Sequence, residues 1–272
     1  MPTSSHRTPH AAHPHSARRR IRTRRQCRAA TLFKGRTGGG ESLLEFSDHK
    51  ILMKVVIDGN IGSGKTTQLN LLEQKGWKVQ REPIDEWPLE LFYKDKSRWA
   101  LLLQMKILQT LQPLKTSDKD VVVYERCLLS TRHVFWEYLL QKKLVRPEEN
   151  DVYSYQYEKD TWFPDVYIFL SKTPEVAFEH IKKRKQSGDS GVSLEYLKDL
   201  DVLYTRMLTN VPCKVHVINA HQSPEEIHQQ ILSLLKLYGM YVSDTGRAKV
   251  QTPGTHQREV LCTPFPNMCR LS

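Results

Sequence analysis

The sequence predicts an α/β fold in which one five-stranded parallel sheet is flanked by helices. Short runs rich in β-branched residues alternate with longer stretches of helical periodicity. Each run is apolar on both faces, which is typical of a parallel sheet covered on both sides. The connections between runs are long enough to hold a crossover helix. The expected strands are Met53 to Ile57, Lys78 to Arg81, Val121 to Tyr124, Val166 to Leu170 and Val215 to Ile218.

Helices are expected wherever an amphipathic stretch of workable length lies between or after these strands. Pro174 and Pro224 fit the first helical turn, where a missing N–H costs nothing. The expected helices are Thr66 to Lys75, Ser97 to Gln112, Leu128 to Leu144, Glu148 to Trp162, Pro174 to Gln186, Ser193 to Leu208 and Pro224 to Tyr238.

The chain of 272 residues predicts one catalytic-size domain, over residues 51–242, with a tail on each side. Residues 1–50 contain too few apolar side chains to form a core and are expected to be disordered. Periodicity fades after Gly239, so residues 243–272 are expected to form a flexible tail.

The positive charge is concentrated at the N-terminus. Residues 1–40 hold nine Arg and Lys34 without any Asp or Glu, which leaves +1 of the net +11 for residues 41–272. A nucleic-acid interaction is therefore expected only through this tail. The tail is compatible with a mitochondrial transit peptide, a nuclear-localisation or polyanion-binding patch, or a translated extension that precedes Met53.

No apolar run approaches the eighteen residues or so that a membrane-spanning helix needs. The expected location is intracellular and most simply cytoplasmic, with mitochondria or nucleus left open by the Arg-rich N-terminus. The cysteines are odd in number, form no CxxC pair and predict neither a disulfide framework nor a zinc site. They are Cys27, Cys127, Cys213, Cys262 and Cys269.

A phosphate-binding loop follows the first strand. The segment from Gly59 to Thr66 matches the pattern GxxxxGK[ST] and lies between a strand and a helix, as phosphate binding by backbone N–H groups requires. Lys65 would reach the outer phosphates, and the Thr66 hydroxyl would bind Mg²⁺. The predicted nucleotide-binding residues here are Gly59, Asn60, Ile61, Gly62, Ser63, Gly64, Lys65, Thr66 and Thr67.

Charged residues end the next two strands. Glu82 follows the second strand, and Glu125 with Arg126 ends the third, so all three are expected at the sheet edge that holds the phosphate loop. A carboxylate there can accept the proton of an attacking hydroxyl, and an Arg can stabilise charge on a transferred phosphoryl group. A surface Glu and a local ion pair are the alternative interpretations.

A basic stretch from His180 to Lys185 leads into a turn at residues 186–191. This arrangement is typical of a short lid over a phosphate site. A solvated helix face is the competing interpretation, because Lys runs are usually solvent-exposed.

Five motifs occur in the order and near the spacing of the deoxyribonucleoside kinase family. They are GNIGSGKTT, REPIDEW, LFYKDKSRWALLLQ, YERCLLSTRHVF and IKKRKQSGDSGVSLEYL. Over about residues 53 to 220 the chain most resembles thymidine-kinase members of the mitochondrial and insect multisubstrate type, with a cellular or viral source left open. The resemblance implies a P-loop kinase that transfers the γ-phosphoryl group of ATP to a deoxynucleoside in nucleotide salvage for DNA synthesis.

The resemblance implies roles for the charged residues. Glu82 matches the base that activates the 5′-hydroxyl, and Arg126 matches an arginine near the 5′-oxygen. Thr66 and Glu125 match the Mg²⁺ site, while Arg184 matches a lid arginine on the donor phosphates.

Five further residues match the nucleoside site. Trp87 corresponds to an aromatic side chain beside the base and sugar, Gln104 to the amide that pairs with the base edge, and Phe135 to the stacking ring. Tyr93 and Asp189 lie where the family binds the 3′-hydroxyl. Asp189 is one methylene shorter than the Glu that is usual there.

Two other departures from the family pattern concern the phosphate side of the site. Cys127 replaces the Ser that usually follows Glu-Arg, and Gln186 stands where the lid often has a second Arg. The latter change removes one donor to phosphate, which is expected to affect the rate rather than the class of reaction.

Base preference is expected to depend on Leu111 and Thr131. Relatives that prefer deoxycytidine or accept purines carry an Arg and Asp pair at these places. Without this pair there is room for a thymine methyl group, so thymidine is favoured, with deoxyuridine and deoxycytidine as secondary substrates.

Two other functions remain as alternatives. A thymidylate kinase shares the fold but normally has Asp-Arg at positions 125 and 126 and lacks a strand-end base such as Glu82. A regulatory or nucleic-acid-associated ATPase would use the Arg tail. The family resemblance also implies a homodimer through helices such as Leu128 to Leu144.

Overall fold

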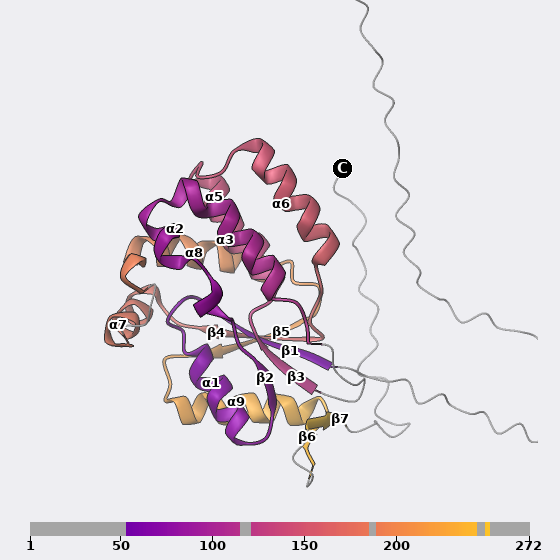
Figure 1. The fold of residues 1–272 in the computed structure, drawn as a ribbon. Coiled ribbons are helices and arrows are strands. Elements are labelled where there is room, and N and C mark those ends of the chain that lie inside the picture. The colour runs from indigo at the N-terminus through magenta and orange to yellow at the C-terminus, as the bar shows by residue number, and fades with distance from the viewer. Residues whose placement is uncertain (1–52, 115–120, 185–188, 244–247, 251–272) are drawn as a thin grey trace, which may run out of the picture. The chain divides into compact units, whose positions relative to one another are not determined.

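The predicted sheet is present in the computed structural model, which describes residues 53–114, 121–184, 189–243 and 248–250 (Figure 1). All five strands are parallel and lie in the order β2-β3-β1-β4-β5. The fold class is therefore confirmed, and no strand end differs from the expected one by more than one residue. The strands are β1 Met53–Asp58, β2 Lys78–Gln80, β3 Val121–Glu125, β4 Val166–Ser171 and β5 Lys214–Asn219.

The strand order brings three loops to one place. From β1 the chain passes to β2 at the edge, returns through β3 beside β1, and then continues to β4 on the other side of β1. Ile57 of β1 is in register with Glu125 of β3, so these two strands end at the same level. Because ligand sites in such sheets lie outside the carboxyl ends at this reversal of order, the loops after β1, β2 and β3 meet there.

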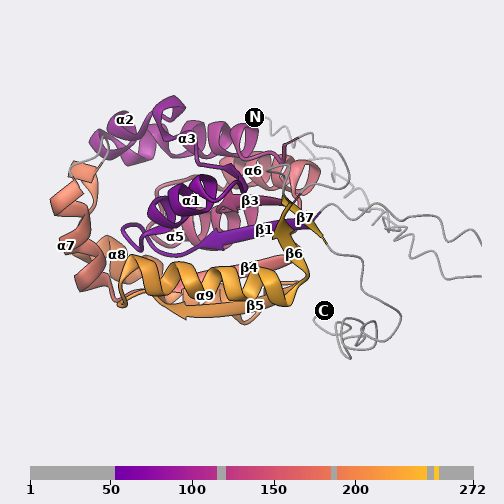
Figure 2. The same ribbon diagram turned by 90° about the horizontal axis from the view of Figure 1, so that it is seen from below.

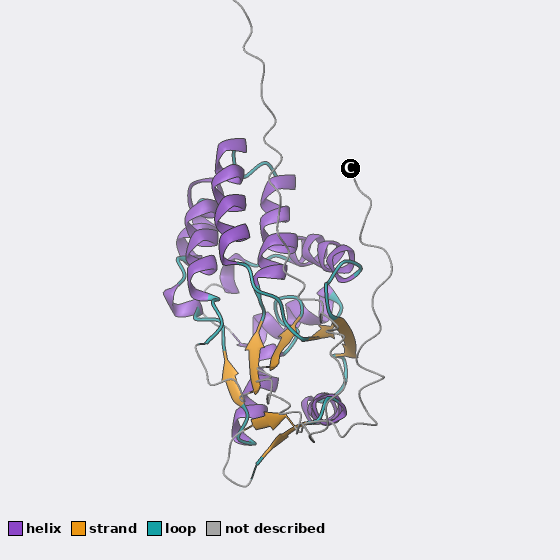
Figure 3. Ribbon diagram, turned by 90° about the vertical axis from the view of Figure 1, so that its right-hand side faces the viewer, coloured by secondary structure: helices purple, strands orange, loops and turns teal. Residues whose placement is uncertain are grey.

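Alternate side chains of the strands enter two separate cores. Val55 and Ile57 pack in one cluster, whereas Val56 packs in the other, as the two-residue period of a strand dictates. Figures 1 and 3 show a large helical layer on one face of the sheet, and Figure 2 shows α1 and α9 on the other. The covering helices are α1 Lys65–Gln74 and α9 Pro224–Leu237 on one face, and α3 Lys96–Thr110, α6 Pro147–Asp160 and α8 Leu194–Leu208 on the other.

Several short elements complete the described fold. The sequence did not predict α2 or the β6–β7 pair, because elements of three to six residues are too short to show periodicity. Strand β7 lies within residues 243–272, whereas residues 244–247, 251–272 and 1–50 lie outside the described residues. No helix in the described ranges is long and apolar enough to cross a bilayer. The short elements are η1 Ile84–Glu86, α2 Leu89–Lys94, η3 Asp189–Gly191, β6 Met240–Val242 and β7 Ala248–Val250, and the remaining longer helix is α7 Pro174–Arg184.

The single helix expected from Leu128 to Leu144 is instead three segments. These are α4 Leu128–Ser130, the π-helical η2 Thr131–Trp136 and α5 Glu137–Gln141. The hydroxyls of Ser130 and Thr131 both donate to the Cys127 carbonyl, and such bonds compete with regular helix geometry. Wider π turns are frequent at functional sites, and this one carries Thr131 and Phe135 to the cavity described below.

Helix α7 packs directly on the phosphate-binding loop at Gly62. Gly62 has a φ of 81°, and a Cβ atom there would lie 2.5 Å from the Ala177 carbonyl oxygen of α7. Only glycine combines this backbone conformation with so close an approach. Gly64 also has a positive φ, of 102°, but a Cβ atom there would meet nothing within 4 Å.

These two glycines give a matched test of the α7 contact. Both Gly62→Ala and Gly64→Ala should lose about 1 kcal/mol of unfolding free energy through backbone strain. Gly62→Ala should lose about a further 1–3 kcal/mol, because the added methyl group overpacks a backbone contact. Urea unfolding measures both values, and equal losses would contradict close packing at Gly62.

Candidate functional site

A cavity of about 570 Å³ opens where β1, β2 and β3 end. The phosphate loop, His180, Arg184 and Asp189 line part of it, and helices α2, α3 and η2 supply much of the remaining wall. Most of the residues selected from the sequence line this one space. They are Ile61, Gly62, Gly64, Lys65, Thr66, Thr67, Glu82, Trp87, Tyr93, Gln104, Glu125, Arg126, Thr131, Phe135, Arg184 and Asp189.

Within the phosphate loop, Gly59, Asn60 and Ser63 are buried behind the cavity wall. The Asn60 side-chain amide donates to the Leu197 carbonyl of α8 at 2.9 Å, which fixes the loop to the helical layer. Lys65 donates to the carbonyls of Gly59 and Asn60 at 3.3 and 3.1 Å. Burial and the nearby Arg126 lower the pKa of Lys65 to about 8.

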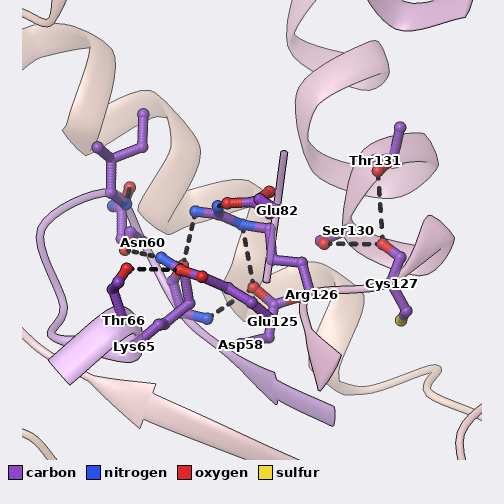
Figure 4. Close-up of polar contacts among 12 residues, drawn as sticks. Asp58, Asn60, Lys65, Thr66, Glu82, Glu125, Arg126, Cys127, Ser130 and Thr131 are labelled. Carbon is purple, nitrogen blue, oxygen red and sulfur yellow. Dashed lines mark hydrogen bonds and ion pairs between the residues drawn. The ribbon is translucent and has the colours of Figure 1, made fainter. Parts of the chain in front are cut away.

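Thr66 and Glu125 provide two oxygen ligands at the start of α1 and the end of β3. The Thr66 hydroxyl donates to Glu125 Oε1 at 2.9 Å (Figure 4). Oxygen atoms suit Mg²⁺, which is commonly held by one or two protein groups together with water and substrate phosphates. This pair therefore fits a magnesium site, and no cluster of three or more acidic, His or Cys ligands occurs among the described residues.

Glu82 and Arg126 form an ion pair in the centre of the site (Figure 4). Arg126 Nη1 donates to Glu82 Oε2 at 2.5 Å, and the two side chains are only 7% and 10% exposed. Burial is the largest influence on the Glu82 carboxyl and raises its pKa to about 7, although Arg126 opposes the shift. A carboxyl with this pKa can accept a proton near neutral pH.

Two residues of this charge cluster were missed in the sequence. Asp58 lies 3.3 Å from Arg126 Nε, and the Tyr204 hydroxyl accepts from the same nitrogen at 3.2 Å. Asp58 ends β1, so the strand-end rule that identified Glu82 could have found it. No sequence signal marked Tyr204, because it lies at an ordinary buried position of α8.

The wall made by α2, α3 and η2 is mainly apolar and aromatic. Gln104 is 3% exposed, and its Oε1 atom has no hydrogen-bond partner among the described residues. Trp87 donates through Nε1 to Thr110 Oγ1 at 2.9 Å, which fixes its ring. A buried acceptor left without a donor is costly, so this part of the cavity is suited to a ligand that has an N–H group.

Leu111 does not border the cavity as the sequence led us to expect. It caps the C-terminus of α3, is only 4% exposed and packs in the core. Its carbonyl accepts a hydrogen bond from Trp162 Nε1 at 2.8 Å, which holds the helix end. Ile107, one turn earlier on α3, lines the cavity instead. Thr131 does reach the cavity.

Arg184 and Asp189, which lie in the segment of the expected lid, bind each other. Arg184 donates two hydrogen bonds to the carboxylate, at 2.9 and 2.8 Å, across residues 185–188, which lie outside the described ranges. Gly191 packs so tightly on Tyr93 that a Cβ atom there would lie 2.0 Å from Tyr93 Cγ. Burial and the nearby Asp189 raise the pKa of Tyr93, which stays a neutral hydrogen-bonding hydroxyl.

Comparison with known proteins finds a family model and several relatives, all of them kinases. A family model described as deoxynucleoside kinase matches residues 55–236. A putative kinase of Invertebrate iridescent virus 6 is 34% identical over 178 residues, which cover 64% of this chain and 91% of that protein. Chicken deoxycytidine kinase 2 is 26% identical over 231 residues, covering 70% and 87% of the two chains.

Another curated relative and a solved structure are also similar to this chain. Mitochondrial thymidine kinase 2 of Macaca fascicularis is 28% identical over 200 residues, covering 64% of this chain and 73% of that protein. A solved structure of deoxyadenosine kinase from M. mycoides with bound dATP has a TM-score of 0.61 at 23% identity. It covers 68% of this chain and 99% of that chain, and it supports the fold alone.

The raised pKa of Glu82 predicts a pH dependence. A base must be deprotonated, so kcat/KM should fall about tenfold per pH unit below a midpoint near pH 7. Above about pH 8 it should fall again, because Lys65, with a pKa of about 8, loses the positive charge that stabilises the phosphates. With an ordinary Glu pKa, of about 4.3, the activity would stay level down to about pH 5. A profile of kcat/KM from pH 5 to 9 distinguishes the two, and Glu82→Gln is the control that should lack the acid limb.

Proposed function

Because the chain belongs to the deoxynucleoside kinase family, we propose that it transfers the γ-phosphoryl group of ATP to the 5′-hydroxyl of a pyrimidine deoxynucleoside, with thymidine favoured. The observation that carries this proposal is the meeting of Glu82, Arg126 and the phosphate-loop Lys65 in one cavity. The first can accept a proton, and the other two can stabilise phosphoryl charge.

In the proposed reaction, Glu82 Oε2 accepts the proton of the 5′-hydroxyl as its oxygen bonds to the γ-phosphorus. The bond from that phosphorus to the bridging oxygen breaks, and ADP leaves with the electron pair. Lys65 and Arg126 stabilise the negative charge on the transferred group. Thr66 and Glu125 would hold Mg²⁺, which would supply positive charge to neutralise the donor phosphates.

The wall around Gln104 supports recognition of a pyrimidine. The Oε1 atom that lacks a partner can accept from thymine N3–H, while Nε2 donates to O4, and the same amide can serve cytosine. Phe135 provides a ring for stacking. Thr131 and Ile107 are uncharged, which leaves apolar space for a thymine methyl group. The preference for thymidine therefore depends on these two residues rather than on Leu111.

Tyr93 and Asp189 are proposed to bind the sugar 3′-hydroxyl. Both line the cavity, and the contact of Gly191 with Tyr93 keeps η3 against α2. A hydroxyl and a carboxylate together can accept and donate to one sugar hydroxyl. Arg184 would then turn from Asp189 to the donor phosphates, where a guanidinium makes paired hydrogen bonds.

A substrate panel tests the function directly. The full chain is incubated with ATP, Mg²⁺ and each deoxynucleoside, or with thymidine monophosphate as acceptor. We expect 5′-monophosphates, with the highest kcat/KM for thymidine. Phosphorylation of thymidine monophosphate alone would indicate a thymidylate kinase, and ATP hydrolysis without transfer would indicate an ATPase. Either result would overturn the proposal.

Replacing the proposed base gives a second test. Glu82→Gln keeps the size of the side chain but cannot accept the proton, so kcat should fall by about two to four orders of magnitude. The KM for the nucleoside should change little. Glu86→Gln, on the exposed side of η1, is a control that should retain activity. Turnover of Glu82→Gln close to that of the wild type would remove Glu82 from the mechanism.

Gln104 offers a test of base recognition. Gln104→Leu keeps much of the volume but removes both the donor and the acceptor, so kcat/KM for thymidine should fall by about 10–200-fold. Steady-state kinetics with thymidine and deoxycytidine measure the change. Gln109→Leu, on the exposed face of the same helix, is the control. An unchanged kcat/KM would mean that the base does not bind against Gln104.

The catalytic domain is proposed to lie within residues 51–242, which include the whole family match. A homodimer is also proposed, but the segment from Leu128 to Leu144 is a poor interface because its large apolar side chains are mostly buried. The adjoining helices α3 and α6 instead expose Leu102, Val152 and Tyr155. Sedimentation equilibrium, which measures the mass in solution, tests this face. We expect a dimer for the wild type and a monomer for Tyr155→Glu, and a Tyr155→Glu dimer would exclude this interface.

A further inference from the structure

Arg126 is held on the side away from the cavity by groups that do not line it. Its Nη2 atom donates to the Gly59 carbonyl at 3.1 Å, and its Nε atom faces the Tyr204 hydroxyl and Asp58. These contacts use the opposite edge of the guanidinium from Nη1, which binds Glu82 (Figure 4). The side chain is only 6% exposed, so each polar contact is made in a desolvated place.

Asp58 is completely buried at the end of β1. Its carboxylate accepts hydrogen bonds from the Gly59 N–H at 2.7 Å, the Tyr167 hydroxyl at 2.6 Å and the Tyr204 hydroxyl at 3.0 Å. A buried carboxylate is tolerated only with such partners. Asp58 is therefore held in a fixed position beside Arg126.

Tyr204 connects this carboxylate to the guanidinium. Its hydroxyl donates to Asp58 Oδ1 and accepts from Arg126 Nε. The ring is fixed between Phe169, at 5.3 Å between centroids, and Phe135, at 6.4 Å. A residue of α8 thus reaches the carboxyl end of β1 and completes the set of contacts that hold Arg126.

We propose that Asp58 and Tyr204 are positioning residues that hold Arg126 in place while Glu82 turns to the substrate. The inference rests on the proposed function, in which Glu82 must release Arg126 to accept the proton of the 5′-hydroxyl. A guanidinium held by Glu82 alone would follow that carboxylate. Because Nε is bound by Tyr204 and Asp58 and Nη2 by the Gly59 carbonyl, Nη1 remains directed at the reacting oxygen.

Tyr204→Phe tests this role with Tyr167→Phe as its matched control. Both tyrosines are fully buried and donate to Asp58, but only the Tyr204 hydroxyl also bonds Arg126. Tyr204→Phe should lower kcat about ten- to a hundredfold, the usual effect of a small misplacement, with KM within about threefold. Tyr167→Phe should lower kcat less than about threefold. Equal effects on kcat would overturn the proposal.

A double-mutant cycle tests whether Tyr204 acts through Arg126. In an Arg126→Lys background, which lacks the Nε donor, Tyr204→Phe should change kcat less than about twofold. Full additivity of the two losses would overturn the proposal. Asp58→Asn, which keeps the shape but removes the charge, should resemble Tyr204→Phe in lowering kcat with little change in KM.

Hydrogen exchange of the Arg126 Nε–H, followed by NMR, keeps the test independent of activity. Exchange should be faster in Tyr204→Phe than in Tyr167→Phe, and equal rates would contradict the proposal. A wild-type chain that phosphorylates no deoxynucleoside would refute the proposed function instead, since the exchange measurement would still report on the support of Arg126.

Discussion

The guanidinium of Arg126 joins the ends of three strands through contacts with Glu82 after β2, and with Asp58 and Gly59 at the end of β1. Arg126 itself follows β3 with a left-handed φ of 59°, a conformation that costs energy in a residue with a side chain. The strain is offset by four polar contacts made in a buried place. Removing one member would leave another charge uncompensated, so the rest of the site depends on this group.

Much of this arrangement could be predicted because its signals are local. The apolar runs identify the strands, the glycine pattern identifies the phosphate loop, and acids directly after strands mark the site edge. Parallel pairing then places Glu82 beside Arg126 without any knowledge of side-chain positions. This is why most of the selected residues were found around one cavity.

The parts that the sequence did not predict arise from tertiary packing. Nothing local distinguishes Tyr204 from any other buried helix residue, and its role appears only when α8 packs on the sheet near the carboxyl end of β1. The π-helical turn at η2 also depends on neighbours, since Trp136 stacks on Tyr153 of α6 at 3.9 Å. Leu111 was misplaced because a match to the family pattern gives a position in the chain but not the point at which α3 leaves the cavity wall.

The most direct test of the central claim is a crystal structure of the chain with thymidine, Mg²⁺ and a non-hydrolysable ATP analogue. The account predicts the nucleoside 5′-oxygen within hydrogen-bond distance of the Glu82 carboxylate, at about 2.6–3.2 Å. Arg126 should keep its bonds to Asp58, Tyr204 and the Gly59 carbonyl. A 5′-oxygen remote from Glu82, or an Arg126 that has left these partners to follow Glu82, would contradict the account.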